Sequence, residues 1–358
     1  MAEEQPEKGT EQNPLTREDV LKAIEENGGT AEGLDLSGMW FENKINLGGL
    51  ELKGIILQEA ILWNANLEKA NLHAVNLQKA KLGGVNLQRA KLNYANLKEA
   101  NLSYTNLQEA SLDNAHLEKA NLTYSNLERA KLFGAYLENA DLSFSNLSSA
   151  LLGAAQLKGA ALADTNLERT LLYAANLEGV FLQYVKLSSD TFLQNVEWGT
   201  HILAQEKHGQ FRWAVDSYRQ LKTWYTEHGM YDIAGKFFYR EMEAKRKDLS
   251  WRMNPLLKLW SWTLRLLCGY GEGPERVIIW AASVIFGLAA AYYFWGTFDT
   301  KSFGDTLYYS VASFTALGYG QWAPQPTGWA QGMGAVEAVI GVFSMALFLV
   351  TFTRKMTR

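Results

Sequence analysis

A leucine recurs at every fifth position without interruption from Leu47 to Leu187. A small or β-branched residue usually lies two positions before each leucine, and polar or charged residues fill most of the other positions. A period of five residues fits neither an α-helix, which repeats about every 3.6 residues, nor a β-strand, which repeats every two. The chain must therefore turn a corner every five residues, so that the leucine and the small residue point inward each time.

These repeats, as in ANLEKANLHAVNLQKA at 65–80, resemble the pentapeptide-repeat family, whose motif reads A(N/D)LxX. The resemblance implies a right-handed quadrilateral β-helix over residues 45–187, with four repeats in each coil. One coil cannot bury its leucines alone, but stacked coils bury them in a continuous column. Asparagines at successive levels are expected to form side-chain ladders, as in other stacked β structures.

The outward surface of the repeats suggests binding or spacing rather than catalysis. It offers a surface for an unknown protein partner or ligand, or it is a solvated spacer, because its charges are mixed in sign. Lys81, Lys91 and Lys131 interrupt the column of Asn and Asp residues. An acidic mimic of DNA is therefore not expected, and the modest net charge of −4 argues against a nucleic-acid partner.

Two soluble segments flank the repeats. Residues 1–44 are expected to be disordered or to form an N-terminal cap; their polar beginning has no apolar core, which excludes a signal peptide and predicts a cytoplasmic location. Residues 188–250 predict a cytoplasmic helical connector, because apolar residues between Phe211 and Tyr225 recur at helical spacing. Cys268 is the only cysteine, which excludes an intramolecular disulfide and a cysteine-based metal site.

Residues 251–275 predict an amphipathic helix at the membrane surface. Pro255 suits a first helical position, and the run after it is too short and too charged to span a bilayer. Its tryptophans fit the headgroup zone, and a basic excess favours anionic inner-leaflet lipid at 251–268. The alternative is a core helix of the soluble domain. The sequence Gly-Tyr-Gly at 269–271 predicts a turn before the membrane.

Residues 276–358 predict a membrane domain with two spans. Residues 277–295 and 328–353 are apolar, apart from one glutamate, and long enough to cross about 30 Å of hydrocarbon. Arg276 precedes the first span, and Arg354 follows the second. Positive-inside counting therefore places both chain ends in the cytoplasm of a multi-pass protein of a bacterial inner (plasma) membrane.

The segment between the spans, FGDTLYYSVASFTALGYGQWAPQP at 303–326, predicts a short helix followed by irregular backbone. Asp305 can start the helix, which runs to about Thr315. Membranes tolerate irregular backbone only where it is buried in protein or lines a water-filled path. Carbonyl oxygens from several copies of such a segment can replace the hydration shell of a cation.

This segment resembles the pore of the two-transmembrane potassium-channel family. The resemblance rests on the aromatic pair Tyr308-Tyr309, on Ser310-Val311 and on Pro324. It implies a homotetramer in the lipid bilayer, which binds K⁺ through filter backbone carbonyls. The implied filter is Thr315, Ala316, Leu317, Gly318, Tyr319 and Gly320, with Gln321, Glu337 and Tyr309 at its mouth or as its support and Gly341 as a gating hinge.

Two residues depart from the family's filter. Ala316 stands where the family has threonine, so the innermost ring of hydroxyl oxygens is absent, and Thr315 lies one residue too early to replace it. Gln321 replaces the usual aspartate, so the outer mouth lacks a ring of charges. We expect potassium selectivity to be retained but weakened, with Na⁺ as a second candidate permeant ion.

Two residues of the second span carry open alternatives. Glu337 is its only ionisable residue, and such residues usually have a role. Its side chain is expected behind the filter, in the ion path, or protonated between subunits. Gly341 matches the glycine at which the family's inner helix bends, but close helix packing at a small residue explains it equally well.

The sequence thus predicts a tetrameric cation channel, not an enzyme, with permeant K⁺ and no other cofactor. Gating input is expected from the N-terminal side, through the Trp-rich interfacial helix. One alternative is a membrane-anchored scaffold whose β-helix binds a partner and whose pore is vestigial. Another is a nonselective or sodium-permeable channel, which differs only in the energetics of the filter.

Overall fold

The computed structural model describes residues 7–295, 297–298, 302–318 and 326–356. The chain folds into two compact units, Met1–Ser217 and Tyr218–Arg358. The boundary lies inside helix α3 (Phe211–Glu227), so the first unit extends past residue 187, where the sequence placed the end of the repeats.

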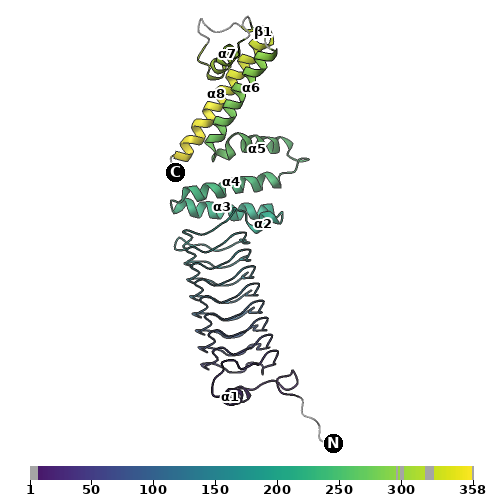
Figure 1. The fold of residues 1–358 in the computed structure, drawn as a ribbon, viewed down its shortest axis with the longest axis vertical. Coiled ribbons are helices and arrows are strands. Elements are labelled where there is room, and N and C mark those ends of the chain that lie inside the picture. The colour runs from purple at the N-terminus through teal and green to yellow at the C-terminus, as the bar shows by residue number, and fades with distance from the viewer. Residues whose placement is uncertain (1–6, 296, 299–301, 319–325, 357–358) are drawn as a thin grey trace. The chain divides into compact units, whose positions relative to one another are not determined.

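The first unit is a β-helix, as its period of five predicts (Figure 1). Parallel backbone bridges join residues 20 apart, as between Asn66 and Asn86. Each coil makes four two-residue turns. The leucines and small residues of the repeats are buried, as Leu67 and Ala70 are. The right-handed, quadrilateral form of the coil stays a prediction.

The turns of the β-helix are strained, and stacking compensates the strain. The second turn residue is often left-handed although it is not glycine, as at Lys69 (φ 58°) and Tyr104 (φ 59°). This conformation costs roughly 1–2 kcal/mol for an L-residue. Burying one leucine contributes about 1.5–3 kcal/mol, and backbone bonds to the next coil add to it, as from Leu67 N to Asn86 O at 2.8 Å. The coils are therefore stable together but not singly.

Asparagine side chains form the predicted ladder along the coils. Asn86 Nδ2 donates to Asn66 Oδ1 at 3.3 Å, and Asn106 Nδ2 donates to Asn86 Oδ1 at 3.2 Å. Asn86 Oδ1 also accepts from the backbone N–H of Gln88 at 3.2 Å. Each such asparagine therefore joins two neighbouring coils and stabilises the start of its own turn.

The β-helix begins earlier and ends later than its leucines indicate. Parallel bridges pair Asp35 with Ile56 at one end and Asn176 with Glu197 at the other. The residues of both pairs are 21 positions apart in the sequence, instead of 20 as in the regular repeats. Each end of the β-helix therefore accommodates one inserted residue. Helix α2 (Ala204–Lys207) then continues the chain, and Ala204 N donates to Val180 O at 3.0 Å.

The N-terminal segment caps the first coil, which is one of the two forms expected for residues 1–44. Leu15 pairs in parallel with Phe41. Helix α1 (Arg17–Glu26) starts at a capping box in which Thr16 and Asp19 bond each other reciprocally. Hydrogen bonds from Lys8 and Thr16 hold the pKa of Asp19 well below its ordinary value. Backbone pairing and this cap compensate for the polar composition that had predicted disorder.

The second unit begins with the end of α3 and continues through helices α4 to α8 (Figure 1). Its remaining elements are α4 (Tyr231–Asp248), α5 (Pro255–Cys268), the 3₁₀ turn η1 (Gly269–Gly271), α6 (Pro274–Trp295), β1 (Thr297–Phe298), α7 (Phe303–Thr315), β2 (Pro326–Thr327) and α8 (Trp329–Met356). The antiparallel pair β1–β2 joins the outer ends of α6 and α8. The membrane-surface helix of the sequence analysis corresponds to α5, whereas the predicted connector at 188–250 begins with the last part of the β-helix and becomes helical only from α2 onward.

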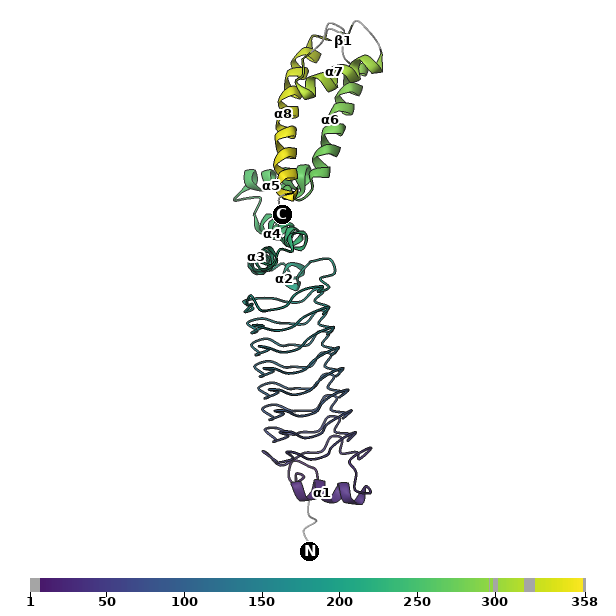
Figure 2. The same cartoon turned by 90° about the vertical axis from the view of Figure 1, so that its left-hand side faces the viewer.

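Helices α6 and α8 are long and apolar enough to cross a membrane, with mean hydropathies of 2.0 and 2.2. Only 17% and 22% of their apolar windows are buried, unlike the core helices of a soluble protein. Helix α7 lies between their outer ends (Figure 2). Tyr292, Tyr309 and Ala330, one from each helix, form the buried core there.

Helix α5 exposes its apolar side chains. Leu256 keeps 80% of its surface, and Leu257 and Trp260 are also exposed. A core helix of a soluble domain would bury these side chains, so the structure argues against that alternative. The exposed face instead suits the interface of a bilayer.

Candidate functional site

The site begins where α7 ends. Thr315 Oγ1 donates to Val311 O at 2.7 Å, so its hydroxyl is used by its own helix. Ala316 caps the helix in the left-handed conformation (φ 52°), where glycine is usual. Gly318 also has a positive φ, 87°, whereas Leu317 between them does not. This alternation of handedness lets successive backbone carbonyls turn toward one side.

The rest of the expected filter lies beyond the described residues. Tyr319, Gly320 and Gln321 are outside them, as is Pro324. The predicted short helix is present as α7, but it begins at Phe303 after Ser302 rather than at Asp305. Asp305 lies in its first turn, where a carboxylate is favourable next to the positive end of the helix dipole.

Glu337 is fully buried where α6, α7 and α8 meet. Tyr292 OH of α6 donates to Glu337 Oε2 at 3.0 Å, and the hydroxyl of Ser310 in α7 contacts Glu337 Oε1. Ser310 Oγ also lies 2.9 Å from Ile285 O of α6. One carboxyl group thus fixes α7 against both spans. The position of Glu337 relative to the filter stays a prediction, because the expected filter from residue 319 onward lies outside the described residues.

Gly341 brings the backbones of α8 and α7 into direct contact. A Cβ atom at this position would lie 1.7 Å from Phe314 O and 2.6 Å from the carbonyl carbon. No other residue fits without moving one of the helices. Close packing is therefore the role of Gly341 that has a direct structural reason, and the hinge stays a prediction. Phe314 lies two residues before Ala316, so this contact positions the start of the expected filter.

Tyr309 holds the middle of α7. Its hydroxyl donates to Ala330 O of α8 at 3.2 Å, and its ring meets that of Tyr292 edge to face at 5.2 Å. Trp329 Nε1 donates to Trp295 O at 3.1 Å, which joins the outer ends of both spans. The aromatic residues therefore hold α7 and the two spans as one frame.

Sequence reasoning missed a polar cluster that joins α4 to the entrance of the first span. Glu243 is buried and forms ion pairs with Arg246 and Arg265, each at 3.0 Å. Tyr270 OH donates to the same carboxylate at 3.1 Å. Trp262 lies 5.4 Å from each guanidinium group. This cluster links α4, α5 and η1 through one carboxylate.

Tyr270 is also the strained residue of η1. All three residues of this turn have positive φ, and at 58° Tyr270 adopts a conformation that costs a non-glycine residue about 1 kcal/mol or more. Burial raises the pKa of Tyr270, so its hydroxyl keeps the proton that Glu243 accepts. The sequence correctly predicts a turn at Gly269-Tyr270-Gly271, but it does not show that the tyrosine is held from α4.

Glu241 makes the corresponding link between α4 and α3. It is buried and pairs with Lys222 at 2.9 Å, Lys245 at 2.7 Å and Arg219 at 3.3 Å. Burial opposes ionisation most strongly, yet hydrogen bonds from Lys245 and Lys222 hold the pKa of Glu241 below its ordinary value. Glu241 and Glu243 are two positions apart, so they leave opposite sides of α4. Acidic residues at this spacing inside the basic run REMEAKRK were the signal for both links.

Among the described residues, no group of three or more His, Cys, Asp or Glu side chains could hold a metal ion. The polar groups around α7 are backbone carbonyls, hydroxyls and the carboxyl group of Glu337. Such groups bind cations by replacing their water.

Family models match both parts of the chain. A pentapeptide repeat region matches residues 70–147, and a model of eight pentapeptide repeats matches 150–188. An ion-channel model matches residues 279–358, which include most of α6 and all of α7 and α8. No curated protein matches the chain.

Solved structures that are similar to about half of the chain include two cyanobacterial pentapeptide-repeat proteins and one resistance protein. HetL, which is involved in heterocyst differentiation regulation in the cyanobacterium Nostoc sp. strain PCC 7120, is 26% identical, covering 51% of this chain and 94% of its own, with a TM-score of 0.20. Rfr23 from the cyanobacterium Cyanothece 51142 is 25% identical. This match covers 50% of this chain and 97% of Rfr23, with a TM-score of 0.14. QnrB1, a plasmid-mediated fluoroquinolone resistance protein, is 18% identical. This match covers 47% of this chain and 91% of QnrB1, with a TM-score of 0.31. By the family models, the chain carries pentapeptide repeats followed by a two-transmembrane ion-channel domain, in the order predicted from the sequence.

Proposed function

We propose that this protein is a homotetrameric cation channel of the cell membrane, selective for K⁺ but less strictly than its family. The observation that carries the proposal is the ion-channel match over residues 279–358 on the frame of α6, α7 and α8. Purified protein in planar bilayers should carry cation current. Bilayers that never conduct under any applied voltage or ionic gradient would contradict the proposal.

Helix α7 acts as the pore helix in this proposal. Its 13 residues give a length of about 20 Å, too short to cross the hydrocarbon. Its C-terminal end carries partial negative charge, which favours a cation next to residues 316–318. Glu337 and Gly341 hold this end at a fixed place, so the carbonyls that follow are positioned before any ion arrives.

The tetramer follows from the geometry of coordination. One chain supplies only one line of carbonyl oxygens, and a dehydrated cation needs them on all sides. A closed ring of four identical chains provides them. In the monomer Leu317 keeps 84% of its surface exposed, as expected of a residue that other copies surround. Mass measurement of the detergent-solubilised protein should give four chains.

Ala316 sets the selectivity in this proposal. Adding a hydroxyl should raise the ratio of K⁺ to Na⁺ permeability, but threonine is a poor test because a β-branched residue disfavours the left-handed conformation at this site. Ala316→Ser supplies the hydroxyl with less strain, and Ala316→Gly is the matched control for backbone freedom. We expect a higher ratio, measured by reversal potential, in the serine variant only. Equal ratios in all three proteins would show that the missing hydroxyl does not limit selectivity.

Gating input enters through the connector in this proposal. The Glu243 cluster joins α4 to α5 and η1, and η1 leads directly into α6. Glu243→Gln, which weakens both ion pairs, should change the open probability, as should truncation before Asn254. Glu275→Gln, at an exposed position in the first turn of α6, is the control. Unchanged gating in the first two proteins would leave the β-helix as an anchor only.

The membrane placement follows the positive-inside rule. Arg276 lies in the first turn of α6 and Lys355 lies near the end of α8, so the rule puts both chain ends and the β-helix in the cytoplasm. Helix α5 then lies on the inner leaflet with its exposed leucines and tryptophans in the interface. Protease protection in inside-out vesicles tests this orientation.

The rival function is a membrane-anchored scaffold with a vestigial pore. The absence of the filter hydroxyl at Ala316 is the observation that favours it. A cation flux assay in liposomes separates the two, because a scaffold gives no flux while it still forms folded oligomers.

A further inference from the structure

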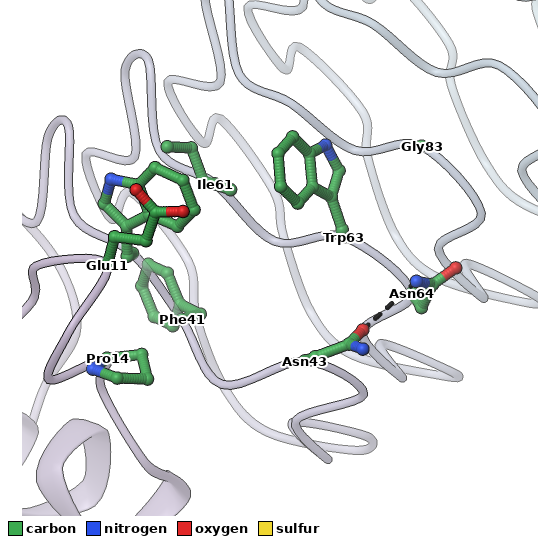
Figure 3. Close-up of a pocket in the computed structure, with 9 residues that line it drawn as sticks. Glu11, Pro14, Phe41, Asn43, Ile61, Trp63, Asn64 and Gly83 are labelled. Atoms are coloured by element: carbon green, nitrogen blue, oxygen red, sulfur yellow. Dashed lines mark hydrogen bonds between the residues drawn. The ribbon is translucent and has the colours of Figure 1, made fainter.

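A cavity of about 480 Å³ lies at the N-terminal end of the β-helix (Figure 3). Its apolar walls are Trp40, Phe41, Ile61 and Trp63 from the first coils. The N-terminal segment closes it from another side with Pro14 and Glu11, as Figure 3 shows. The volume is in the range of small-molecule sites, which reach from about 300 to 1,000 Å³.

Two glycines open this space beside Trp63. At the matching turn of the next coil the residues are Gly83 and Gly84, whereas the coil after that has Ser103 and Tyr104. A Cβ atom on Gly83 would contact the Trp63 ring at 3.8 Å. The absence of side chains at this turn therefore leaves the indole of Trp63 accessible, and 42% of its surface is exposed.

The segment that carries Glu11 is held in place rather than loosely attached. Gly9 N donates to Asn13 O at 2.8 Å and closes a short loop around Glu11. Trp40 N donates to Gly9 O, and Leu15 N donates to Trp40 O, both at 2.8 Å. Glu11 thus has a fixed place at the cavity, and within the described part of the chain no ion pair involves its carboxylate.

The two indoles offer their faces in two directions. The rings of Trp40 and Trp63 are 5.7 Å apart and nearly perpendicular, at 85°. The faces of tryptophan rings attract ammonium groups, and tryptophan is the strongest aromatic side chain in this respect. The chain itself shows this preference, because Lys81 Nζ lies 5.8 Å from the centre of the Trp63 ring.

We propose that this cavity is a binding site for a small organic ammonium ion, held by the indoles of Trp40 and Trp63 and by the carboxylate of Glu11. The aromatic and aliphatic walls suit the alkyl groups of such an ion, and Glu11 supplies the opposite charge. Lys81 opposes the ligand with a like charge at the rim and so limits its affinity. The site lies within the first unit and does not depend on whether the second unit conducts ions.

Calorimetric titration of the full-length protein in detergent with choline tests the proposal. Its uncharged carbon isostere, dimethylbutanol, is the matched ligand control. Choline should bind, and the isostere should bind about tenfold more weakly or not at all, because the cation–π attraction and the charge of Glu11 are lost. Equal affinities for the two molecules would overturn the proposal, since the cavity would then be only an apolar hole.

Four variants assign the binding to this cavity. Trp63→Leu and Glu11→Gln should each lower the choline affinity several-fold. Lys81→Gln should raise it, because it removes a like charge. Tyr104→Leu, at an exposed position of the same turn column, should leave it unchanged. Unchanged affinity in Trp63→Leu would place the binding elsewhere, for instance in the membrane unit, and would also overturn the proposal.

Loss of folding is separated from loss of the site by one further variant. Trp63→Phe keeps an aromatic face of smaller area and should recover part of the affinity that Trp63→Leu loses. All variants should keep the circular dichroism of the parent protein. Absence of any choline binding in the correctly folded parent protein would refute the site, whatever currents the protein carries in bilayers.

Discussion

The β-helix and the pair of helices α6 and α8 are both rich in apolar residues, but only the β-helix buries them within one chain. Leu107 of the repeats has 0% of its surface exposed, whereas Val339 of α8 keeps 71%. Each coil covers the leucines of the next, and the two spans cover little of each other. The first unit thus buries the leucines of its repeats by itself. The second unit leaves much apolar surface exposed, which lipid and, in the proposed channel, further copies would cover.

The comparison changes for polar groups. The β-helix places its amides and charges at the surface, as the Asn66–Asn86 ladder shows. The second unit buries whole carboxyl groups, at Glu241, Glu243 and Glu337, and surrounds each with donors. Buried carboxylates without partners would cost several kcal/mol, about 3–5 when one partner of a buried pair is removed. These buried groups therefore determine which helices pack together in the second unit. In the β-helix the repeated sequence determines how the coils stack.

The largest effect is expected from a test of which unit is stabilised by burial of apolar side chains within one chain. Leu107→Ala should lower the free energy of unfolding by about 2–5 kcal/mol, because it leaves a cavity between coils. Val339→Ala, in the exposed face of α8, should change stability by about 0.5 kcal/mol or less in detergent. Thermal unfolding followed by circular dichroism measures both. Similar losses in the two variants would refute the contrast between the units.

The next effect concerns the close approach of α8 to α7. Gly341→Ala should cost about 1–3 kcal/mol or more through overpacking and should abolish normal current, because the new methyl group would displace Phe314. Gly332→Ala in the same helix is the control, since a Cβ atom there meets nothing within 4 Å. Detergent stability and bilayer recording are the measurements. A Gly341→Ala protein with native current would show that α7 and α8 separate easily.

A smaller effect is expected from the asparagine ladder. Asn86→Ala removes bonds to Asn66, Asn106 and Gln88, but these groups can bond water at the surface. We therefore expect a loss of about 1 kcal/mol in the free energy of unfolding. Asn86→Asp keeps the acceptor and should restore part of it. A loss as large as that of Leu107→Ala would mean that amide ladders, rather than leucines, hold the coils together.

The smallest effect is a pH dependence in the connector. The pKa of Glu241 is lower in the folded protein than its ordinary value of 4.5, so its pairs contribute fully above that pH. The contribution is lost as the pH falls through the lower, folded value. The hydrogen-exchange protection factors of α3 and α4 should therefore fall in acid more in the parent protein than in Glu241→Gln. Identical acid sensitivity in both would remove Glu241 as the cause.

Much of this architecture could be predicted because its signals are local. A period of five dictates a turning chain, and two uninterrupted apolar runs dictate two spans, so both were read from neighbouring residues. For residues 7–14 the sequence left disorder and a cap both open, because their pairing partner around Trp40 is distant in the sequence. The Glu243 cluster was missed for the same reason: Arg265 and Tyr270 approach it only through the packing of three elements.

The candidate site divides in the same way. The order of residues from Thr315 to Gly318, and the missing hydroxyl at Ala316, belong to the sequence. Packing assigned the partners: Glu337 meets Ser310 and Tyr292, and Gly341 meets Phe314. Repetition and hydropathy are properties of residues that are neighbours along the chain, so the sequence alone reveals them. The role of a buried carboxyl group, or of a glycine in contact with a carbonyl, depends on residues that are distant in the sequence. Only the tertiary structure brings those residues together.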